Sequence, residues 1–514
     1  MKLKVRLIGL TSGGKPVVVL NKEDATELGV RGLDRVTVKY EKTEVTAIVN
    51  VTTTLVSRGE VGAYEELDHV RLQENKEIEV LPAKPPTSLH FITNKLKGRK
   101  LTYEEIKQIV NDVVKRNLTE VEIAAFVTSL QNFGLDLDEA TSLSRAMVET
   151  GETLKLSKKN IVDKHSIGGC AGDKTTLLLV PIIAASGLTI PKTSSRAITS
   201  AAGTADRAEI LMPVTLNMDE MKDVVEKTNG CIIWGGSLHL APADDIFIEV
   251  EYPLSIDPLL LPSVMSKKKA VGAKFLVIDI PTGRGTKVKT IGDADLLAKD
   301  FISLGEKLDI KTQCAVTDGE QPIGYTIGSA LEAKEALEVL MRRKNLPDLV
   351  DKATSIAGIL LEMTGKKNGK QLALEILKSG KAEEKIREII MHQGGDSEIK
   401  PEDIKIGEFG LDVNSKNSGI VLWMDNNKLI ELARAAGAPK DKGAGIHLYK
   451  KLGDKVEKGQ KLLTVYAEKS NKLERVRSFL EQEDYMIGVG HRREMLIHEV
   501  KEMPVTKKTF ILER

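Results

Sequence analysis

Apolar and polar residues alternate in short runs over the first 81 positions, which is the pattern of half-buried β-strands. Residues 21–25 favour one short helix among them, and the proline-rich segment 82–86 marks the clearest domain boundary of the chain. This pattern predicts a small β-barrel-like domain over residues 1–84. Its alternating segments are 2–10, 15–20, 35–42, 44–51 and 77–81.

Beyond the proline-rich segment the apolar positions take the spacing of amphipathic helices. Capping boxes, in which a hydroxyl or carboxylate residue stands three positions before a glutamate, begin these helices, and Gly134 and Gly151 end two of them. We predict a helical domain over residues 85–159, joined by helices near 240–270. The capping boxes are Thr102–Glu105, Thr119–Glu122 and Asp136–Glu139, and the helices lie near 102–116, 119–132 and 136–150.

From residue 160 the pattern becomes strand, loop, helix. Short apolar runs at 231–234 and 275–280, bounded by glycine or proline, are typical of buried strands in a parallel sheet. Residues 160–431 are therefore predicted to form an α/β domain. A turn-rich stretch at 453–460 between β-like segments indicates a separate C-terminal α+β domain over 432–514, so the fold class is multidomain α/β. The helices expected between the strands lie near 175–185, 291–307 and 330–343.

Composition narrows the possible partners. The chain of 514 residues carries 75 lysines and arginines against 74 acidic residues, so its net charge of +1 gives no general reason to bind nucleic acid or an anionic membrane. The longest uncharged apolar stretch, 175–191, is short and contains two prolines, which argues against a membrane span. Three widely spaced cysteines form no zinc motif. We expect a cytoplasmic protein that holds no metal.

The segment 163–176 is the strongest candidate for chemistry. Gly168, Gly169 and Gly172 stand between a predicted strand and a predicted helix, where backbone N–H groups and the helix dipole favour an anion. Lys164, Ser166 and Thr176 add a positive charge and hydroxyl groups. The spacing does not fit the G-x-x-x-x-G-K-[ST] loop of nucleoside triphosphatases. A glycine turn that only packs a helix on a sheet is the alternative interpretation.

Further polar segments follow along the chain. Residues 193–206 are rich in hydroxyl groups, and Asp257 precedes a proline that could direct its carboxylate into a cleft. Lys268 and Lys269 belong to a lysine triplet, which normally marks a solvated helix face. The segment 281–287 follows a predicted strand but lacks the full dinucleotide-binding pattern, which disfavours NAD. Together these segments indicate phosphate or phosphoribosyl chemistry at one sheet edge.

The motifs resemble those of a known family. DKHSIGG at 163–169, followed by GDKT at 172–175, is similar to the signature of the thymidine and pyrimidine-nucleoside phosphorylases. The resemblance runs in order from about residue 88 to the end and implies a helical, an α/β and a C-terminal α+β domain. Supporting matches lie at 101–106, 240–244, 320–324 and 443–447.

Two departures from the nucleoside enzymes resemble archaeal AMP phosphorylases. The chain has a β domain before the proline-rich segment, and SSRAITSAAGT at 194–204 replaces a glycine-rich segment. This resemblance implies phosphorolysis of nucleoside 5′-monophosphates, in which AMP and phosphate give adenine and ribose 1,5-bisphosphate, with CMP and UMP as further substrates. The spacing from Asp257 to Ser263 is shorter than the family pattern, which affects the geometry expected for the base pocket.

The resemblance also implies roles for individual residues. Asp257 would be the proton donor, His165 and Lys267 would contact the base, and no cofactor would be needed beyond phosphate as co-substrate. The residues implied to contact the nucleotide are Gly169, Ser195, Arg196, Ala197, Ile198, Thr199, Ser200, Thr204, Ser263 and Lys287. Those implied to hold inorganic phosphate are Lys164, Ser166, Thr176 and Thr204.

Other functions stay open at this point. A thymidine or pyrimidine nucleoside phosphorylase is the nearest alternative, and an anthranilate-type phosphoribosyltransferase would need an acidic magnesium–diphosphate site that the sequence does not show. The turn at 453–460 resembles lipoyl and biotinyl carrier domains, but Lys469 lies in no hairpin motif. A non-enzymatic scaffold is the alternative from another class. We expect a homo-oligomer, at least a dimer and larger through residues 1–84.

Overall fold

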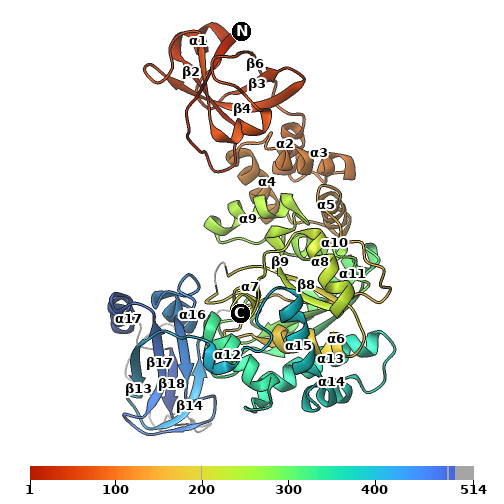
Figure 1. The fold of residues 1–514 in the computed structure, drawn as a ribbon, viewed down its shortest axis with the longest axis vertical. Coiled ribbons are helices and arrows are strands. Elements are labelled where there is room, and N and C mark those ends of the chain that lie inside the picture. The colour runs from red at the N-terminus through yellow and green to blue at the C-terminus, as the bar shows by residue number, and fades with distance from the viewer. Residues whose placement is uncertain (198–199, 483–485, 492–514) are drawn as a thin grey trace, which may run out of the picture.

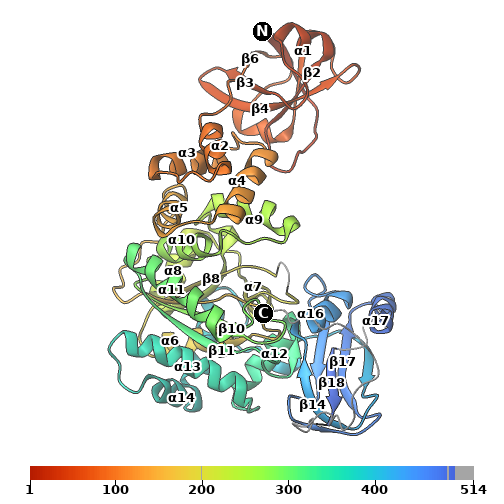
Figure 2. The same cartoon turned by 180° about the vertical axis from the view of Figure 1, so that it is seen from behind.

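The molecule is elongated, with a barrel at one end, helices next to it, and an α/β part that carries a further β-rich part on its side (Figures 1 and 2). A computed structural model describes residues 1–197, 200–482 and 486–491. The predicted Ile198 and Thr199 contacts therefore lie outside the described residues. Within the described residues, none of the helices combines the length and the apolar character that crossing a membrane requires.

The N-terminal strands form a closed six-stranded barrel in the order β1-β5-β2-β4-β3-β6, which confirms the barrel-like fold predicted for this region. Asn21 caps helix α1, because its side chain accepts a hydrogen bond from the Glu23 N–H. The elements are β1 (Lys2–Leu7), β2 (Val17–Asn21), α1 (Lys22–Leu28), β3 (Arg35–Tyr40), β4 (Thr43–Thr52), β5 (Glu60–Ala63), the 3-10 helix η1 (Glu65–Val70) and β6 (Glu77–Pro82).

All three predicted capping boxes are present, so these helices begin where the sequence indicates. Helix α9 packs against α3 and α4, and α10 packs against α5. The apolar core of this region accordingly joins side chains from 92–147 with others from 241–259. The helices are α2 (Ser88–Leu96), α3 (Tyr103–Val114), α4 (Glu120–Phe133), α5 (Leu137–Glu149), α9 (Pro242–Leu254) and α10 (Leu260–Ala270).

The central sheet is parallel, as predicted. Strands β11, β10 and β7 pair in this order, β8 pairs with β9, and an isolated bridge between Ile161 and Thr189 joins the two groups. Side chains of β10 alternate between two cores: Val277 packs with α6 and α13, whereas Leu276 and Ile278 face α11. The strands are β7 (Val162–Ser166), β8 (Ile190–Ser194), β9 (Gly230–Trp234), β10 (Phe275–Thr282) and β11 (Lys311–Asp318).

Helices cover both faces of this sheet. The three expected helices are present, and α13, α14 and α15 add a layer that the sequence analysis did not predict. The helices are α6 (Thr175–Ala185), α7 (Thr204–Ala208), α8 (Met218–Thr228), α11 (Ile291–Lys307), α12 (Ser329–Leu340), α13 (Pro347–Met363), α14 (Gly369–Lys378) and α15 (Lys381–His392), with the 3-10 helices η2 (Gly235–Ser237) and η3 (Pro401–Asp403).

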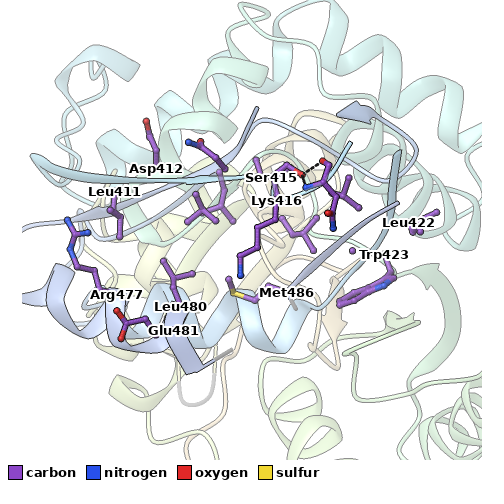
Figure 3. Close-up of a pocket in the computed structure, with 18 residues that line it drawn as sticks. Leu411, Asp412, Ser415, Lys416, Leu422, Trp423, Arg477, Leu480, Glu481 and Met486 are labelled. Carbon is purple, nitrogen blue, oxygen red and sulfur yellow. Dashed lines mark hydrogen bonds between the residues drawn. The ribbon is translucent and has the colours of Figure 1, made fainter. Parts of the chain in front are cut away.

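The C-terminal part contains two antiparallel sheets, ordered β12-β15-β17-β13 and β16-β14-β18. Its strands begin at Phe409, upstream of the predicted division at 432, and one sheet also takes in β12. A cavity of about 610 Å³ lies between β13, β14, β18 and α17, with both apolar and polar side chains around it (Figure 3). The elements are β12 (Thr326–Ile327), β13 (Phe409–Asn414), β14 (Gly419–Met424), α16 (Asn426–Ala435), β15 (Gly445–Leu448), β16 (Lys455–Val456), β17 (Lys461–Ala467), α17 (Ser470–Gln482) and β18 (Ile487–Gly490).

Candidate active site

A pocket of about 520 Å³ lies where strands β7, β8 and β9 end. This is the edge at which open parallel sheets bind ligands. Helix α10 closes the pocket from the side of the helical region, and Ile430 of α16 reaches it from the C-terminal part. The predicted site residues that line it are Lys164, His165, Ser166, Gly169, Thr176, Ser195, Arg196, Ala197, Ser200, Thr204, Ser263 and Lys267.

The glycine-rich loop after β7 needs its glycines for two different reasons. Gly168 and Gly169 line the pocket with φ angles of 83° and 90°, and a Cβ on Gly169 would lie 2.6 Å from the Lys287 backbone nitrogen. Gly172 instead allows close packing, since a Cβ there would lie 2.6 Å from the Thr326 carbonyl oxygen. Thr176, in the first turn of α6, lines the pocket beside the loop. The loop thus both borders the pocket and packs closely against neighbouring backbone.

Buried charges form the floor of the pocket. Lys268 Nζ lies 2.6 Å from an oxygen of Asp163, whose other oxygen is 3.9 Å from Lys192 Nζ. Lys164 Nζ lies 3.8 Å from Asp279. Burial, together with the charges of the neighbouring lysines, lowers the pKa of Lys192 well below its usual value. Burial and the same lysines also lower the pKa of His165 well below its usual value, so its imidazole is neutral near pH 7.

The prediction that Lys268 lies on the surface is wrong. Its side chain is 3% exposed, because successive helical residues point about 100° apart and this position faces the sheet rather than solvent. Lys269, the next residue, is part-exposed and donates a hydrogen bond to the Leu308 carbonyl, so it lies outside the pocket.

The hydroxyl-rich loop after β8 is held by ion pairs of Arg196, which also lines the pocket. Arg196 contacts Glu209 at 2.6 Å and Asp206 at 3.3 Å, and its guanidinium lies over the Trp234 ring at 5.1 Å. Asp206 also accepts hydrogen bonds from the Ala197 and Gly203 N–H groups, at 2.7 and 2.8 Å. These contacts fix the backbone at Ala197 and Gly203 before any ligand binds, which lowers the entropic cost of binding.

A buried carboxylate organises the wall opposite these loops. The Ser263 hydroxyl donates to Asp244 at 2.9 Å, and Lys267 Nζ lies 2.5 Å from the same oxygen. Ser263 and Lys267 are four positions apart on α10, so they share one helix face. Burial alone would lower the pKa of Lys267, but the charges of Asp244 and Asp245 outweigh it and raise this pKa. Asp244 is fully buried.

Asp257 and Lys287 lie outside the pocket lining and contact each other. Asp257 stands in the connection between α9 and α10, and its carboxylate lies 3.2 Å from Lys287 Nζ, with the two side chains 46% and 48% exposed. Burial raises the pKa of Asp257, although Lys287 opposes this shift. Because the Lys287 backbone also borders Gly169, we place this ion pair at the rim of the pocket.

Sequence analysis missed several residues of the site. Trp234, Lys192 and Asp245 line the pocket, and burial raises the pKa of the Asp245 carboxyl. Glu251 of α9 is buried, and burial together with the charge of Asp257 raises its pKa to about 8. Asp244 belonged to a segment that matched the family, but its residue type gave no sign of its contacts. Within the described residues, no cluster of three or more histidine, cysteine or acidic residues could hold a metal ion.

Family models match three parts of the chain from the helical region onward. Residues 89–151 match the model of the glycosyl transferase family helical bundle domain, and residues 158–383 match the a/b domain of the same family. Residues 420–483 match the pyrimidine nucleoside phosphorylase C-terminal domain. The succession agrees with the order that the resemblance implied.

Full-length relatives decide the family. The chain is 48% identical to an AMP phosphorylase of Thermofilum pendens over 100% of both chains. It is 50% identical to an AMP phosphorylase of Thermococcus kodakarensis over 92% of this chain and 95% of the relative. The chain belongs to the AMP phosphorylase family.

This membership confirms the resemblance found in the sequence and identifies the chain as an enzyme of the pentosyltransferase class. Among solved structures, the anthranilate phosphoribosyltransferase of Thermus thermophilus matches with a TM-score of 0.50 and 18% identity. The match covers 59% of this chain and 98% of that one. At this identity the likeness concerns the fold alone.

Proposed function

We propose that this protein cleaves AMP with inorganic phosphate to give adenine and ribose 1,5-bisphosphate. The observation that carries the proposal is a pair of polar loops facing one basic pocket, in a chain related over its full length to AMP phosphorylases. The lining includes four lysines and two arginines, a composition suited to two phosphate groups. They are Lys164, Lys192, Lys267, Lys268, Arg196 and Arg207.

In the proposed arrangement the two loops hold different phosphates. The glycine-rich loop, with Lys164, Ser166 and Thr176, takes inorganic phosphate, whereas the loop after β8 takes the 5′-phosphate of the nucleotide. Displacement at C1′ passes through an oxocarbenium-like state, so the attacking phosphate must be held in line behind the anomeric carbon. Residues of both loops line the same pocket, so in the proposed arrangement they hold the ribose between the two phosphates.

The adenine end of the substrate would lie against α10. Ser263 and Lys267, fixed by Asp244, offer polar contacts to the base. Adenine leaves poorly as an anion, so a proton must reach its imidazole nitrogen during cleavage. We assign this step to Asp257, whose pKa is raised by partial burial, so that it carries a proton more readily than an aspartate at its ordinary pKa. Asp245, which lines the pocket, is the second candidate acid.

The proposal also concerns the co-substrate, further substrates, the cellular location and the assembly of the protein. Phosphate is a co-substrate, and the reaction as written needs no cofactor. CMP and UMP are proposed as further substrates. We further propose a cytoplasmic homo-oligomer, at least a dimer, whose larger assembly depends on the N-terminal barrel.

A substrate comparison tests the function. The purified protein is incubated with AMP, adenosine, thymidine, CMP or UMP, with and without phosphate, and the base and sugar products are quantified. Each charge-assisted contact to the 5′-phosphate contributes about 1.5–3 kcal/mol, so kcat/KM for AMP should exceed that for adenosine by more than tenfold. Comparable kcat/KM for thymidine and AMP would contradict the monophosphate assignment. Product formation from anthranilate and phosphoribosyl diphosphate would favour the transferase instead.

A further inference from the structure

We infer that helix α16, which comes from the C-terminal part of the chain, is a working element of the substrate site, because one face of it holds both substrate loops. Asn426, Ile430 and Arg434 follow one another at intervals of four residues and share a helix face. Asn426 contacts Ala171 of the glycine-rich loop, Ile430 lines the pocket, and Arg434 contacts Ser200 of the loop after β8. The inference rests on the proposed function only in assigning inorganic phosphate and AMP to the two loops.

Asn426 joins the glycine-rich loop to the end of strand β11. Its side chain is fully buried, its Oδ1 accepts a hydrogen bond of 3.0 Å from the Ala171 N–H, and its Nδ2 donates one of 2.7 Å to the Gly319 carbonyl. Ala171 lies between Gly169 and Gly172 of the loop. A buried backbone N–H without a partner is costly, so this carboxamide fixes the conformation of the loop.

The opposite end of the same helix face reaches the loop after β8. Arg434 Nη1 donates a hydrogen bond of 3.3 Å to the Ser200 carbonyl, and Ile430, between the two polar residues, lines the pocket itself. The methyl groups of Ala171 and Ala201, one from each loop, are buried in the same apolar core as Leu429 and Ile430. The helix therefore sets the distance between the two loops.

This geometry gives Asn426 and Arg434 the role of positioning residues, with separate effects. Asn426 acts on the glycine-rich loop, so its loss should weaken binding of inorganic phosphate more than binding of AMP. Arg434 acts on the loop after β8, so its loss should weaken binding of AMP more than binding of phosphate. A residue that only stabilised the C-terminal part would change both Michaelis constants together or neither.

The test compares Asn426→Leu and Arg434→Gln with two controls on exposed positions of the same helix, Asn427→Leu and Glu431→Gln. Michaelis constants for phosphate and for AMP are measured separately. We expect Asn426→Leu to raise KM for phosphate about tenfold and KM for AMP less than threefold, and Arg434→Gln to show the reverse. Arg434→Lys retains a donor for Ser200 and should recover part of the AMP affinity. The controls should stay within twofold of wild type.

Several outcomes would overturn the inference. One is that Asn426→Leu and Arg434→Gln leave both Michaelis constants unchanged. Another is that each variant changes KM for phosphate and KM for AMP equally. A third is that Asn427→Leu changes KM for phosphate as much as Asn426→Leu does. If Asn426→Leu does not fold, Arg434→Gln decides, because Arg434 is only partly buried. If the wild-type protein does not cleave AMP, the proposed function fails. Calorimetric titration with inorganic phosphate alone then decides the inference: weaker binding by Asn426→Leu than by Asn427→Leu supports it, and equal binding refutes it.

Discussion

At the scale of single residues, Asp257 carries the most specific chemical prediction. Asp257→Asn keeps the shape of the side chain but cannot donate a carboxyl proton to the leaving adenine. General acid catalysis typically contributes about a hundred- to ten-thousand-fold, so kcat on AMP should fall by that order while KM changes little. Steady-state kinetics at saturating phosphate measure this effect.

A second substrate separates proton donation from positioning. A ribosyl 5-phosphate with a nitrophenolate leaving group needs no proton, so Asp257→Asn should cleave it nearly as well as wild type. Asp245→Asn is the matched variant, because Asp245 lines the pocket and burial raises its pKa as well. If Asp245→Asn alone shows the leaving-group-dependent loss, the proton comes from Asp245. Equal losses of Asp257→Asn on both substrates would mean that Asp257 orients the ribose or its loop.

Glu335 pairs with Lys174, which follows the glycine-rich loop, and this pair makes the stability of the fold depend on pH in acid. Its carboxylate lies 2.8 Å from both Lys174 Nζ and Lys344 Nζ. Burial alone would raise its pKa, but these two lysines outweigh it and lower the pKa to about 2. Because the folded-state pKa lies below the usual value of 4.5, the stabilisation is complete above that pH and is lost as the pH falls towards 2.

Replacing Glu335 by glutamine should therefore matter less in acid. The difference in unfolding free energy between wild type and Glu335→Gln should shrink by about 2 kcal/mol between pH 5 and pH 3. Denaturant unfolding at a series of pH values measures it. Glu338→Gln, on the same helix, is the control. A difference that is constant over this range would contradict the assigned ion pairs.

The sequence predicted that a residue lies at the site only where adjacent residues in the chain indicated it. Lys164 was found because it adjoins a glycine-rich loop. Lys268 was misplaced because a lysine triplet does not show which of its members faces the sheet, and its partner Asp163 lies 105 residues away. Asn426 was missed for the same reason, since 255 positions separate it from Ala171.

At the scale of elements, the sequence predicted helices and strands correctly where the pattern lies within a few consecutive residues. Helices α3, α4 and α5 were predicted because their capping boxes are written in four consecutive residues. Helices α13, α14 and α15 were missed, and none of them has a side-chain hydrogen bond at its N-cap. Strand β5 was missed because its four residues include a glycine and give too short an alternation.

The contact between α2 and α5 gives a prediction at this scale. Lys95 Nζ lies 2.7 Å from Glu139, both side chains are buried, and Glu139 also accepts a hydrogen bond from the Leu101 N–H. Lys95→Met leaves a buried carboxylate without its cation, so the stability of this region should fall by about 3–5 kcal/mol. Hydrogen exchange of amides in α2 and α5 measures the change.

Two comparisons test the cause. Lys97→Met, at an exposed position just beyond α2, should change the free energy of opening obtained from hydrogen exchange by less than about 0.5 kcal/mol. Adding Glu139→Gln to Lys95→Met removes the uncompensated charge and should restore part of the stability. If the double variant is less stable than Lys95→Met, the loss comes from packing rather than from charge.

At the scale of the whole molecule, the barrel and the catalytic region have separate cores. Buried apolar side chains of residues 3–80 form one cluster, and none of them belongs to the cluster of the helical region. Deleting residues 1–84 should therefore leave a folded enzyme with wild-type kcat/KM on AMP. We expect the assembly to become smaller, as measured by light scattering. An unchanged assembly combined with lost phosphate binding would refute this division of roles.

The attachment of the barrel has a mechanical consequence. Ion pairs of Arg35 with Glu122 and of Lys15 with Glu120 fasten it to helix α4, and the same helical region carries the α10 wall of the pocket. The barrel lies farther from the sheet than that wall does (Figure 1). Any rotation of the helical region about the pocket is thus amplified at the barrel, as at the end of a lever. A change too small to resolve between α10 and the substrate loops becomes a measurable displacement between two probes, one on the barrel and one on the sheet.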